Sequence, residues 1–213
     1  MVKIEADGER EFLVKMSGVV LSYPHLFEPF KARNPKPGEK AKYGAKFLMD
    51  RRDKEQNTDA QTVYKKIVEM AKVNFKQSLP ADKYCLRDGR QLTEDLHNYF
   101  VISANEELRP TVVDRRRQPV TAEDELFYPG CIVNATIRLW VQDSKDWGKR
   151  INANLVGVQF MAHGTRLGGR AKPKADEMFD DVSDKFDDDE YQGEPTGDGG
   201  RDPGDSDSDG LTF

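Results

Sequence analysis

The stretch that decides the fold of this 213-residue chain is CIVNATIRLWV, residues Cys131–Val141. Apolar side chains that recur with a period of two predict a β-strand with one face on a core. By this alternation Cys131, Val133, Ala135, Ile137, Leu139 and Val141 are expected to point inward, and Ile132, Asn134, Thr136, Arg138 and Trp140 outward. Arg138 and Trp140 therefore lie where they can contact a ligand instead of the core.

Further strands are predicted on both sides of this one. Segments rich in β-branched and aromatic residues and bounded by turn residues have the composition of strands. They are residues 11–23, 43–50, 98–106 and 151–162, with a short extended piece at 109–114. Residues 143–150 are predicted as the turn before the last strand, and the proline-rich residues 24–40 as a loop.

One helix is predicted among the strands, between Asn57 and Pro80. Asn57, Thr58 or Asp59 is expected to cap its start, and Pro80 to end it. Its apolar residues recur at helical spacing and are Val63, Ile67, Met70, Ala71 and Phe75.

These elements predict a mainly β fold with one inserted helix. Antiparallel strands of this length with a helix between the early and the late ones fit a five-stranded OB-like barrel. A different α+β sheet fits the same pattern almost as well, because spacing alone does not determine how strands pair.

Charge divides the chain into two parts. Residues 173–213 contain 15 acidic and 3 basic residues, a net charge of -12, whereas residues 1–172 have a net charge of +7. A basic body joined to an acidic segment points to nucleic acid or another polyanion as a partner. We therefore expect a nucleic-acid-binding domain at 1–172 and a disordered acidic tail at 173–213 that ends in Phe213.

Several protein classes do not fit the sequence. Cys85 and Cys131 form no ligand-spaced motif with the three histidines, so no metal and no cofactor are expected. No nucleophile motif and no rigidly placed carboxylate cluster is recognisable in the body, which argues against an enzyme. The sequence also shows neither a signal peptide nor an apolar run long enough to span a membrane, so we expect a cytoplasmic protein that is neither secreted nor membrane-spanning.

Basic and aromatic residues are the more informative signal. Proteins that bind single strands without reading sequence combine a positive groove with aromatic rings on which bases stack. The candidate set is Lys31, Arg33, Tyr43, Lys46, Arg115, Arg116, Arg138, Trp140, Trp147, Lys149 and Arg150. The competing interpretation places most aromatic rings in the core and leaves most lysines to solubility, and both stay open for Tyr43, Trp140 and Trp147.

The tail has features of a docking segment. Its acidic residues resemble a phosphate backbone in charge, so it is expected to compete with DNA for the groove from a high effective concentration. Its end offers apolar side chains next to carboxylates, a combination that suits a partner's pocket with a basic rim. The residues expected to dock are Asp205, Asp207, Asp209, Leu211 and Phe213.

The chain also resembles a known protein family. LSYPHLFEP, YGAKFLM, YPGCIVNATIRLW and NANLVGVQFM, together with the acidic tail, are similar to bacteriophage single-stranded-DNA-binding proteins. The closer resemblance is to a phage family long catalogued as a domain of unknown function, and the layout also resembles the replication binders of short-tailed phages. It covers about residues 12–165.

The resemblance implies an OB fold, sequence-independent binding of single-stranded DNA, and roles in phage replication, recombination and repair. It also implies that the tail contacts a phage DNA polymerase or helicase-primase. Two other functions stay open: a phage nuclease or recombination enzyme, and an interaction protein that uses the tail as a DNA mimic. Neither the sequence nor the resemblance decides between a monomer and a dimer.

Overall fold

The computed structural model describes residues 1–31, 38–168, 178 and 180. Contacts within the chain define one unit from Met1 to Arg170 and a second from Ala171 to Phe213, and the fold below is that of the first. The predicted site residue Arg33 and, apart from Met178 and Asp180, the expected tail at 173–213 lie outside the described residues.

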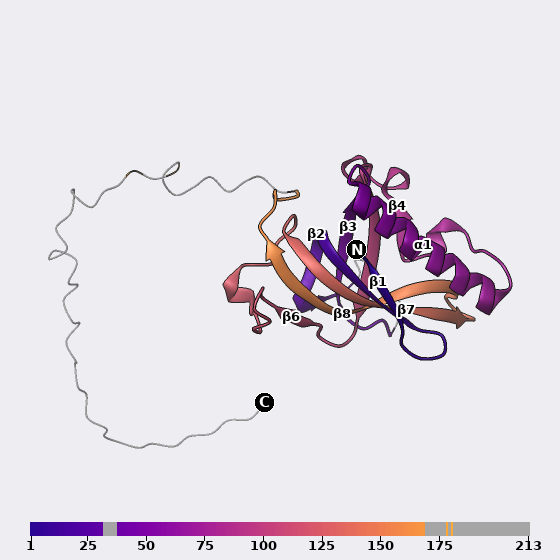
Figure 1. Ribbon diagram of the computed structural model, residues 1–213. Helices are drawn as coiled ribbons and strands as arrows, with labels where there is room; N and C mark the ends of the chain where they lie inside the picture. The colour runs from indigo at the N-terminus through magenta and orange to yellow at the C-terminus, as the bar shows by residue number, and fades with distance from the viewer. Residues whose placement is uncertain (32–37, 169–177, 179, 181–213) are drawn as a thin grey trace, which may run out of the picture. The chain divides into compact units, whose positions relative to one another are not determined.

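Within the described residues, eight strands form one curved sheet (Figure 1). They are β1 (Lys3–Ala6), β2 (Phe12–Phe30), β3 (Lys42–Asp50), β4 (Leu86–Asp88), β5 (Tyr99–Glu106), β6 (Thr111–Val113), β7 (Ile132–Ser144) and β8 (Gly148–Ala162). Their order is β4-β5-β3-β2-β7-β8-β6, with β1 added to β2. Every pair is antiparallel except β6 with β8.

The predicted fold class is confirmed: the chain is mostly β with one helix. The five long strands β2, β3, β5, β7 and β8 are those that the sequence pattern predicts, and β6 corresponds to the predicted extended piece. The strands β1 and β4 have four and three residues, too few to show an alternation. The sheet therefore contains more strands than the five expected.

Two residues connect opposite sides of the sheet. The amide of Cys85 donates to the carbonyl of Ile151 in β8 at 2.9 Å, and the carbonyl of Cys85 accepts from the amide of Ser103 in β5 at 3.0 Å. Tyr84 forms a parallel bridge with Ile151. Because β5 and β8 are not neighbours in the strand order, this segment, which we call the seam (Tyr84–Cys85), shows that the sheet curves back toward itself.

The first long strand extends further than predicted. Residues 24–30 belong to β2, although the prolines in this stretch favoured a loop. Beyond Ser22 this part pairs with β3 through His25 and Phe30, whereas its ladder with β7 ends at Val20. A proline lacks the amide donor and is tolerated where one edge of a strand is unpaired, which explains why Pro24 does not end β2.

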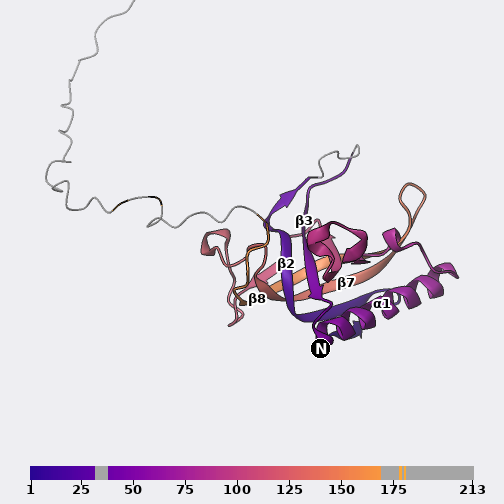
Figure 2. The same ribbon diagram turned by 90° about the horizontal axis from the view of Figure 1, so that it is seen from above.

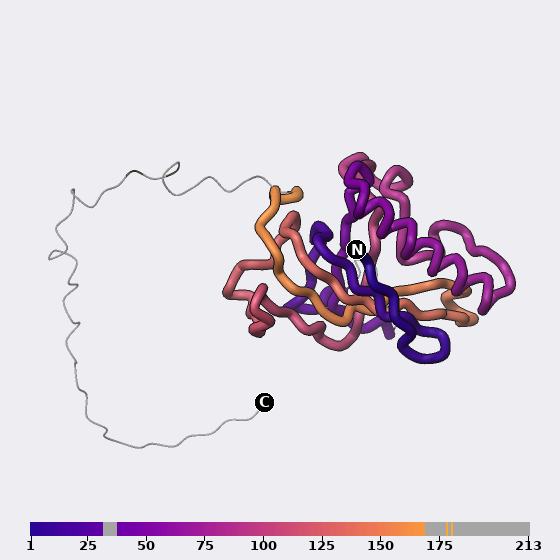
Figure 3. Tube along the Cα trace, in the orientation of Figure 1, coloured from indigo at the N-terminus to yellow at the C-terminus, as the bar shows by residue number. Residues whose placement is uncertain are grey.

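The last two strands form the longest ladder. β7 and β8 pair along their whole length: Ile132 is opposite Ala162 at one end, and Ser144 is opposite Gly148 at the other. Figure 3 shows the two strands side by side. The predicted inward residues of β7 are buried, except that Val141 is only half-buried. The predicted turn at 143–150 is shorter in the structure, because both strands extend into it.

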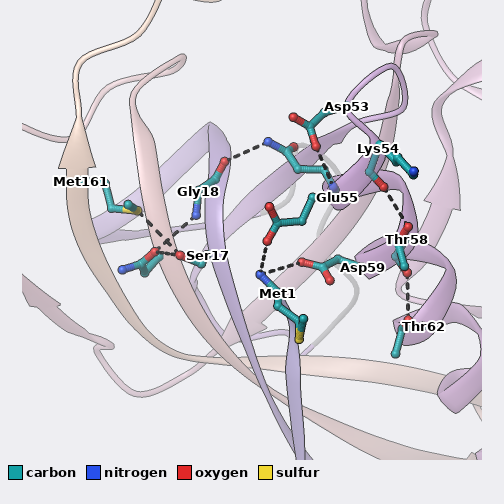
Figure 4. Close-up of polar contacts among 12 residues, drawn as sticks. Met1, Ser17, Gly18, Asp53, Lys54, Glu55, Thr58, Asp59, Thr62 and Met161 are labelled. Carbon is teal, nitrogen blue, oxygen red and sulfur yellow. Dashed lines mark hydrogen bonds and ion pairs between the residues drawn. The ribbon is translucent and has the colours of Figure 1, made fainter.

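The helix α1 (Lys54–Phe75) packs against the sheet (Figure 2), and its five predicted apolar residues are all buried. It begins one turn earlier than predicted because Asp53 is the cap and accepts from the amide of Gln56. Asp59 is instead inside the helix, where its carboxylate lies 3.4 Å from the terminal amine of Met1 (Figure 4).

Short 3₁₀ turns lie between the strands, at Ala81–Lys83, Gly89–Gln91, Glu94–Leu96 and Ala122–Asp124. None of the helices in the described part of the chain combines the length and the apolar character that crossing a membrane requires.

Candidate nucleic-acid interface

A groove of about 540 Å³ lies over the seam and the strands beside it. One wall comes from the β7–β8 hairpin and the other from β3, β4 and β5, with the chain before β3 at the rim. The lining residues are Gly38, Glu39, Lys40, Lys42, Tyr84, Cys85, Arg87, Ser103, Asn105, Glu107, Trp140, Gln142, Trp147, Arg150, Asn152, Ala153 and Asn154. The curvature that the seam maintains thus brings segments far apart in sequence to one site.

Two tryptophans lie on the hairpin wall. Trp140 is half-buried on the outer face of β7, and its indole Nε1–H donates to Oδ1 of Asn154 at 2.7 Å. Trp147 lies in the turn with 47% of its surface exposed. The hydrogen bond fixes the plane of one ring, and the exposure of the other leaves its surface accessible for stacking.

Polar amides extend the same wall. The Asn152 amide donates to Oε1 of Gln142 at 2.7 Å, so the two side chains bridge β8 and β7. Alternation places Asn152 and Asn154 outward on β8, while the residues between and beside them are buried. This wall can therefore donate and accept hydrogen bonds along its length.

Cations line both walls. Lys42 precedes the buried part of β3, Arg87 lies in β4 and Arg150 at the start of β8. The Nε atom of Arg150 is buried and has no hydrogen-bond partner among the described residues. Arg150 lines the groove, so its positive charge can attract an anionic ligand there.

The rim also carries acidic residues, Glu39 and Glu107. Lys40 contacts Glu107 at 2.9 Å, and this hydrogen bond keeps the pKa of the Glu107 carboxyl below its ordinary value. The same contact raises the pKa of Lys40. A phosphate that approaches Lys40 therefore meets a neighbouring carboxylate.

The thiol of Cys85 lies at the floor of the groove but is not set up as a nucleophile. Burial raises its pKa to about 12, so the thiol is protonated at neutral pH. Among the residues that the structure describes, no three His, Cys, Asp or Glu side chains form a group that could hold a metal ion.

The structure brings together three of the predicted site residues, Trp140, Trp147 and Arg150, in the groove. Lys149 is beside them in sequence, but its ammonium lies 5.3 Å from the ring centre of Phe75 in α1.

The other predicted residues lie elsewhere on the body. The guanidinium of Arg138 pairs with Asp7 at 2.6 Å and with Glu11 at 3.6 Å. Lys46 lies over the ring of Tyr23 at 4.4 Å.

Alternation along β3 places Tyr43 on the face that carries the buried Ala45 and Phe47, while Lys31 is exposed just after β2. Arg115 and Arg116 are exposed after β6.

Several groove residues were not predicted. The sequence pattern could have identified Asn152 and Asn154, because asparagine is uncommon in strands and here occupies two successive outward positions. No local pattern indicates Lys42, Arg87 and Asn105, because their place in the groove depends on how β3, β4 and β5 pair with one another.

Similar proteins are known from phages. A protein named p50 from Acyrthosiphon pisum secondary endosymbiont phage 1 is 32% identical over 179 residues, which cover 80% of this chain and 94% of that protein. The structure titled single-stranded DNA-binding protein from bacteriophage Enc34 in complex with ssDNA is 26% identical, with a TM-score of 0.64 over 78% of this chain and 98% of that one. A second structure of the bacteriophage Enc34 single-stranded DNA-binding protein is 27% identical. Its TM-score is 0.62, and the match covers 88% of this chain and 99% of that one.

A protein-family model also matches most of the chain. Residues 12–191 fit the family described as Enterobacter phage Enc34, ssDNA-binding protein. This range contains the five long strands, α1 and every described residue of the groove. The chain therefore belongs to the Enc34 family of phage ssDNA-binding proteins.

Proposed function

We propose that this chain binds single-stranded DNA in the groove, without reading its sequence. The observation that carries the proposal is that two tryptophans and the cations Lys42, Arg87 and Arg150 line one groove. The proposal is supported by the similar structure of the Enc34 protein, which is in complex with ssDNA.

The groove suits a flexible single strand better than a duplex. The cations neutralise backbone phosphates, which is independent of sequence and weakened by salt. Trp140 and Trp147 offer faces on which bases stack, and each stacked base contributes on the order of 1–3 kcal/mol. Paired bases in a duplex have no free face to offer, so stacking selects single strands.

We further propose the wider roles that the family resemblance implies. The protein covers single strands during phage replication, recombination and repair in the host cytoplasm, and it performs no reaction of its own. The acidic residues 173–213 compete with DNA, and their end binds a phage DNA polymerase or helicase-primase. Arg33 and the tail residues belong to this proposal on the grounds of sequence alone.

The test is a titration of labelled oligo-dT and of a matched duplex with the full chain, followed by anisotropy and by tryptophan emission. We expect salt-sensitive binding of the single strand with quenching of tryptophan emission, and much weaker binding of the duplex. Trp140→Ala should lower the affinity for oligo-dT by about 1–3 kcal/mol. The control Thr136→Ala, which changes another outward residue of β7, should leave it unchanged.

The alternatives predict different results. A nuclease would shorten the oligonucleotide when magnesium is added. A DNA-mimic protein would bind neither oligonucleotide, even after removal of the residues beyond Lys172. Absence of oligo-dT binding by both forms of the chain would overturn the proposed function.

A further inference from the structure

A second cationic surface lies outside the groove, around the end of β8. Five rings form a contiguous set there, which we call the ring cluster: Phe27, Phe127, Tyr128, Phe160 and His163. Phe127 contacts Phe27 and Phe160 edge-on at 6.1 and 5.9 Å between ring centres. His163 lies 5.0 Å from Phe160 and stacks on Tyr128 at 5.9 Å.

Three exposed arginines lie on these rings, and we call them the arginine surface: Arg109, Arg115 and Arg166. Their guanidinium carbons lie 5.7 Å from the ring centre of Phe27, 5.5 Å from that of Phe160 and 4.3 Å from that of Tyr128. Arg115 also donates from Nε to the carbonyl oxygen of Met161. Stacking holds a planar guanidinium in place and leaves its edge accessible to an anion.

No carboxylate in the described part of the chain lies within ion-pair distance of these three arginines. Four other arginines of the body are paired with carboxylates: Arg51 and Arg90 with Asp88, Arg52 with Asp50, and Arg138 with Asp7. The arginine surface is thus a group of cations that the described fold orders but does not neutralise.

The two cationic sites lie toward opposite ends of β8. Asn152 faces the groove near the start of this strand, and Phe160 belongs to the ring cluster near its end. At about 3.3 Å per residue, Asn152 and Phe160 are roughly 25 Å apart along the strand. Arg109 is nearer to the groove, because it follows the rim residue Glu107 by two positions. Figure 1 shows the end of β8 beside β6, away from the hairpin turn that carries Trp147.

We propose that the arginine surface is a second contact for the phosphates of the same DNA strand after it leaves the groove. This inference rests on the proposed function of the groove. A phosphate accepts two parallel hydrogen bonds from a guanidinium, and a fixed guanidinium loses less conformational freedom on binding. A strand that reaches both sites must be longer than one that fills the groove alone.

The experiment compares two lengths of oligo-dT: about 6 nucleotides, which is within the range of site sizes of a single OB fold, and about 20, which exceeds that range. The variant is R109Q/R115Q/R166Q in the full chain. The matched control, K65Q/K72Q/K76Q, removes three exposed cations from α1 and its C-terminal cap. Thermal unfolding of both variants verifies that they fold.

We expect the arginine variant to lose about tenfold or more in affinity for the long oligonucleotide, with a salt slope lower by about 2, since three phosphate contacts contribute about 0.7 each. Affinity for the short oligonucleotide and tryptophan quenching should not change. Equal losses for both lengths, or a loss no greater than in the α1 control, would overturn the inference while the groove keeps its function. Failure of the unaltered chain to bind either length would overturn both.

Discussion

At the scale of single residues, the indole of Trp140 is the feature on which stacking depends. Its hydrogen bond to Asn154 connects β7 to β8 and fixes the ring plane. A ring that is already oriented loses little freedom when a base stacks on it. Asn154 is thus a positioning residue, which acts on the nucleic acid through Trp140.

Asn154→Ala should therefore weaken binding of oligo-dT although Trp140 is retained. Loss of one such hydrogen bond is expected to change the binding free energy by about 0.5–1.5 kcal/mol. Anisotropy gives the affinity, and the emission spectrum of the free protein reports whether the indole environment has changed. A normal affinity together with a changed spectrum would show that the ring plane is irrelevant to binding.

The rim residue Glu107 should oppose binding. Its carboxylate repels phosphates and forms an ion pair with Lys40, which is then less available to a phosphate. The lowered pKa of Glu107 keeps this carboxylate ionised through the neutral range. Glu107→Gln is expected to raise the affinity for oligo-dT about 2- to 5-fold at low salt, as for an exposed charge pair. The gain should vanish at high salt because the charges are screened. A gain that persists in high salt would contradict the electrostatic explanation.

At the scale of elements, the beginning of β7 is held by the chain that leaves β8. The amide of Leu167 donates to the carbonyl of Pro129 at 2.9 Å, and the hydroxyl of Tyr128 contacts the amide of Gly164 at 3.2 Å. Gly130 has a φ of +109°, and a Cβ there would overlap the carbonyl oxygen of Thr165. Only glycine fits this close approach of two backbones.

Gly130→Ala should lower the free energy of unfolding by about 1–3 kcal/mol, measured by urea denaturation. The matched control is Gly18→Ala, because Gly18 also has a positive φ of +68° but open space around its Cβ position. The difference between the two variants isolates the close approach from backbone strain. Equal losses of stability would show that the contact with Thr165 does not matter.

The elements that the sequence predicts are those with a local signal. Alternation along 131–141 and helical spacing between Val63 and Phe75 are properties of short segments, and both faces were predicted correctly. The seam has no such signal, since it consists of backbone bonds between Cys85 and residues far away in the chain.

The residues of the candidate site also differ in whether a local sequence pattern predicts them. Trp140, Trp147 and Arg150 lie on one hairpin and were predicted together, because a hairpin keeps neighbours in sequence close in space. Arg138 shares the outward face with Trp140, yet the structure pairs it with Asp7, which no pattern within the strand indicates. The opposite wall depends on strand order, which composition does not encode.

At the scale of the whole molecule, the division of charge is the main feature. The described body carries the groove, whereas residues 173–213 have a net charge of -12. If these residues compete with DNA, they do so from the same chain, at a concentration that dilution does not change.

Truncation after Lys172 should raise the affinity for oligo-dT at low salt, roughly tenfold, because the competitor is removed. The advantage should shrink as salt increases, since ions screen the attraction between acidic residues and the body. The control is a full chain in which the acidic residues beyond Lys172 are replaced by Asn and Gln, which should behave like the truncated one. A truncation without effect at low salt would remove the competition from the proposal.

The seam has a consequence for the dynamics of the complex. The amide of Cys85 can exchange its hydrogen with solvent only when its bond to Ile151 opens, which requires the seam to separate from β8. A DNA strand bound in the groove contacts both sides of this junction and should hold them together. Slower exchange at Cys85 would then report the occupied groove directly, from a backbone amide beneath it.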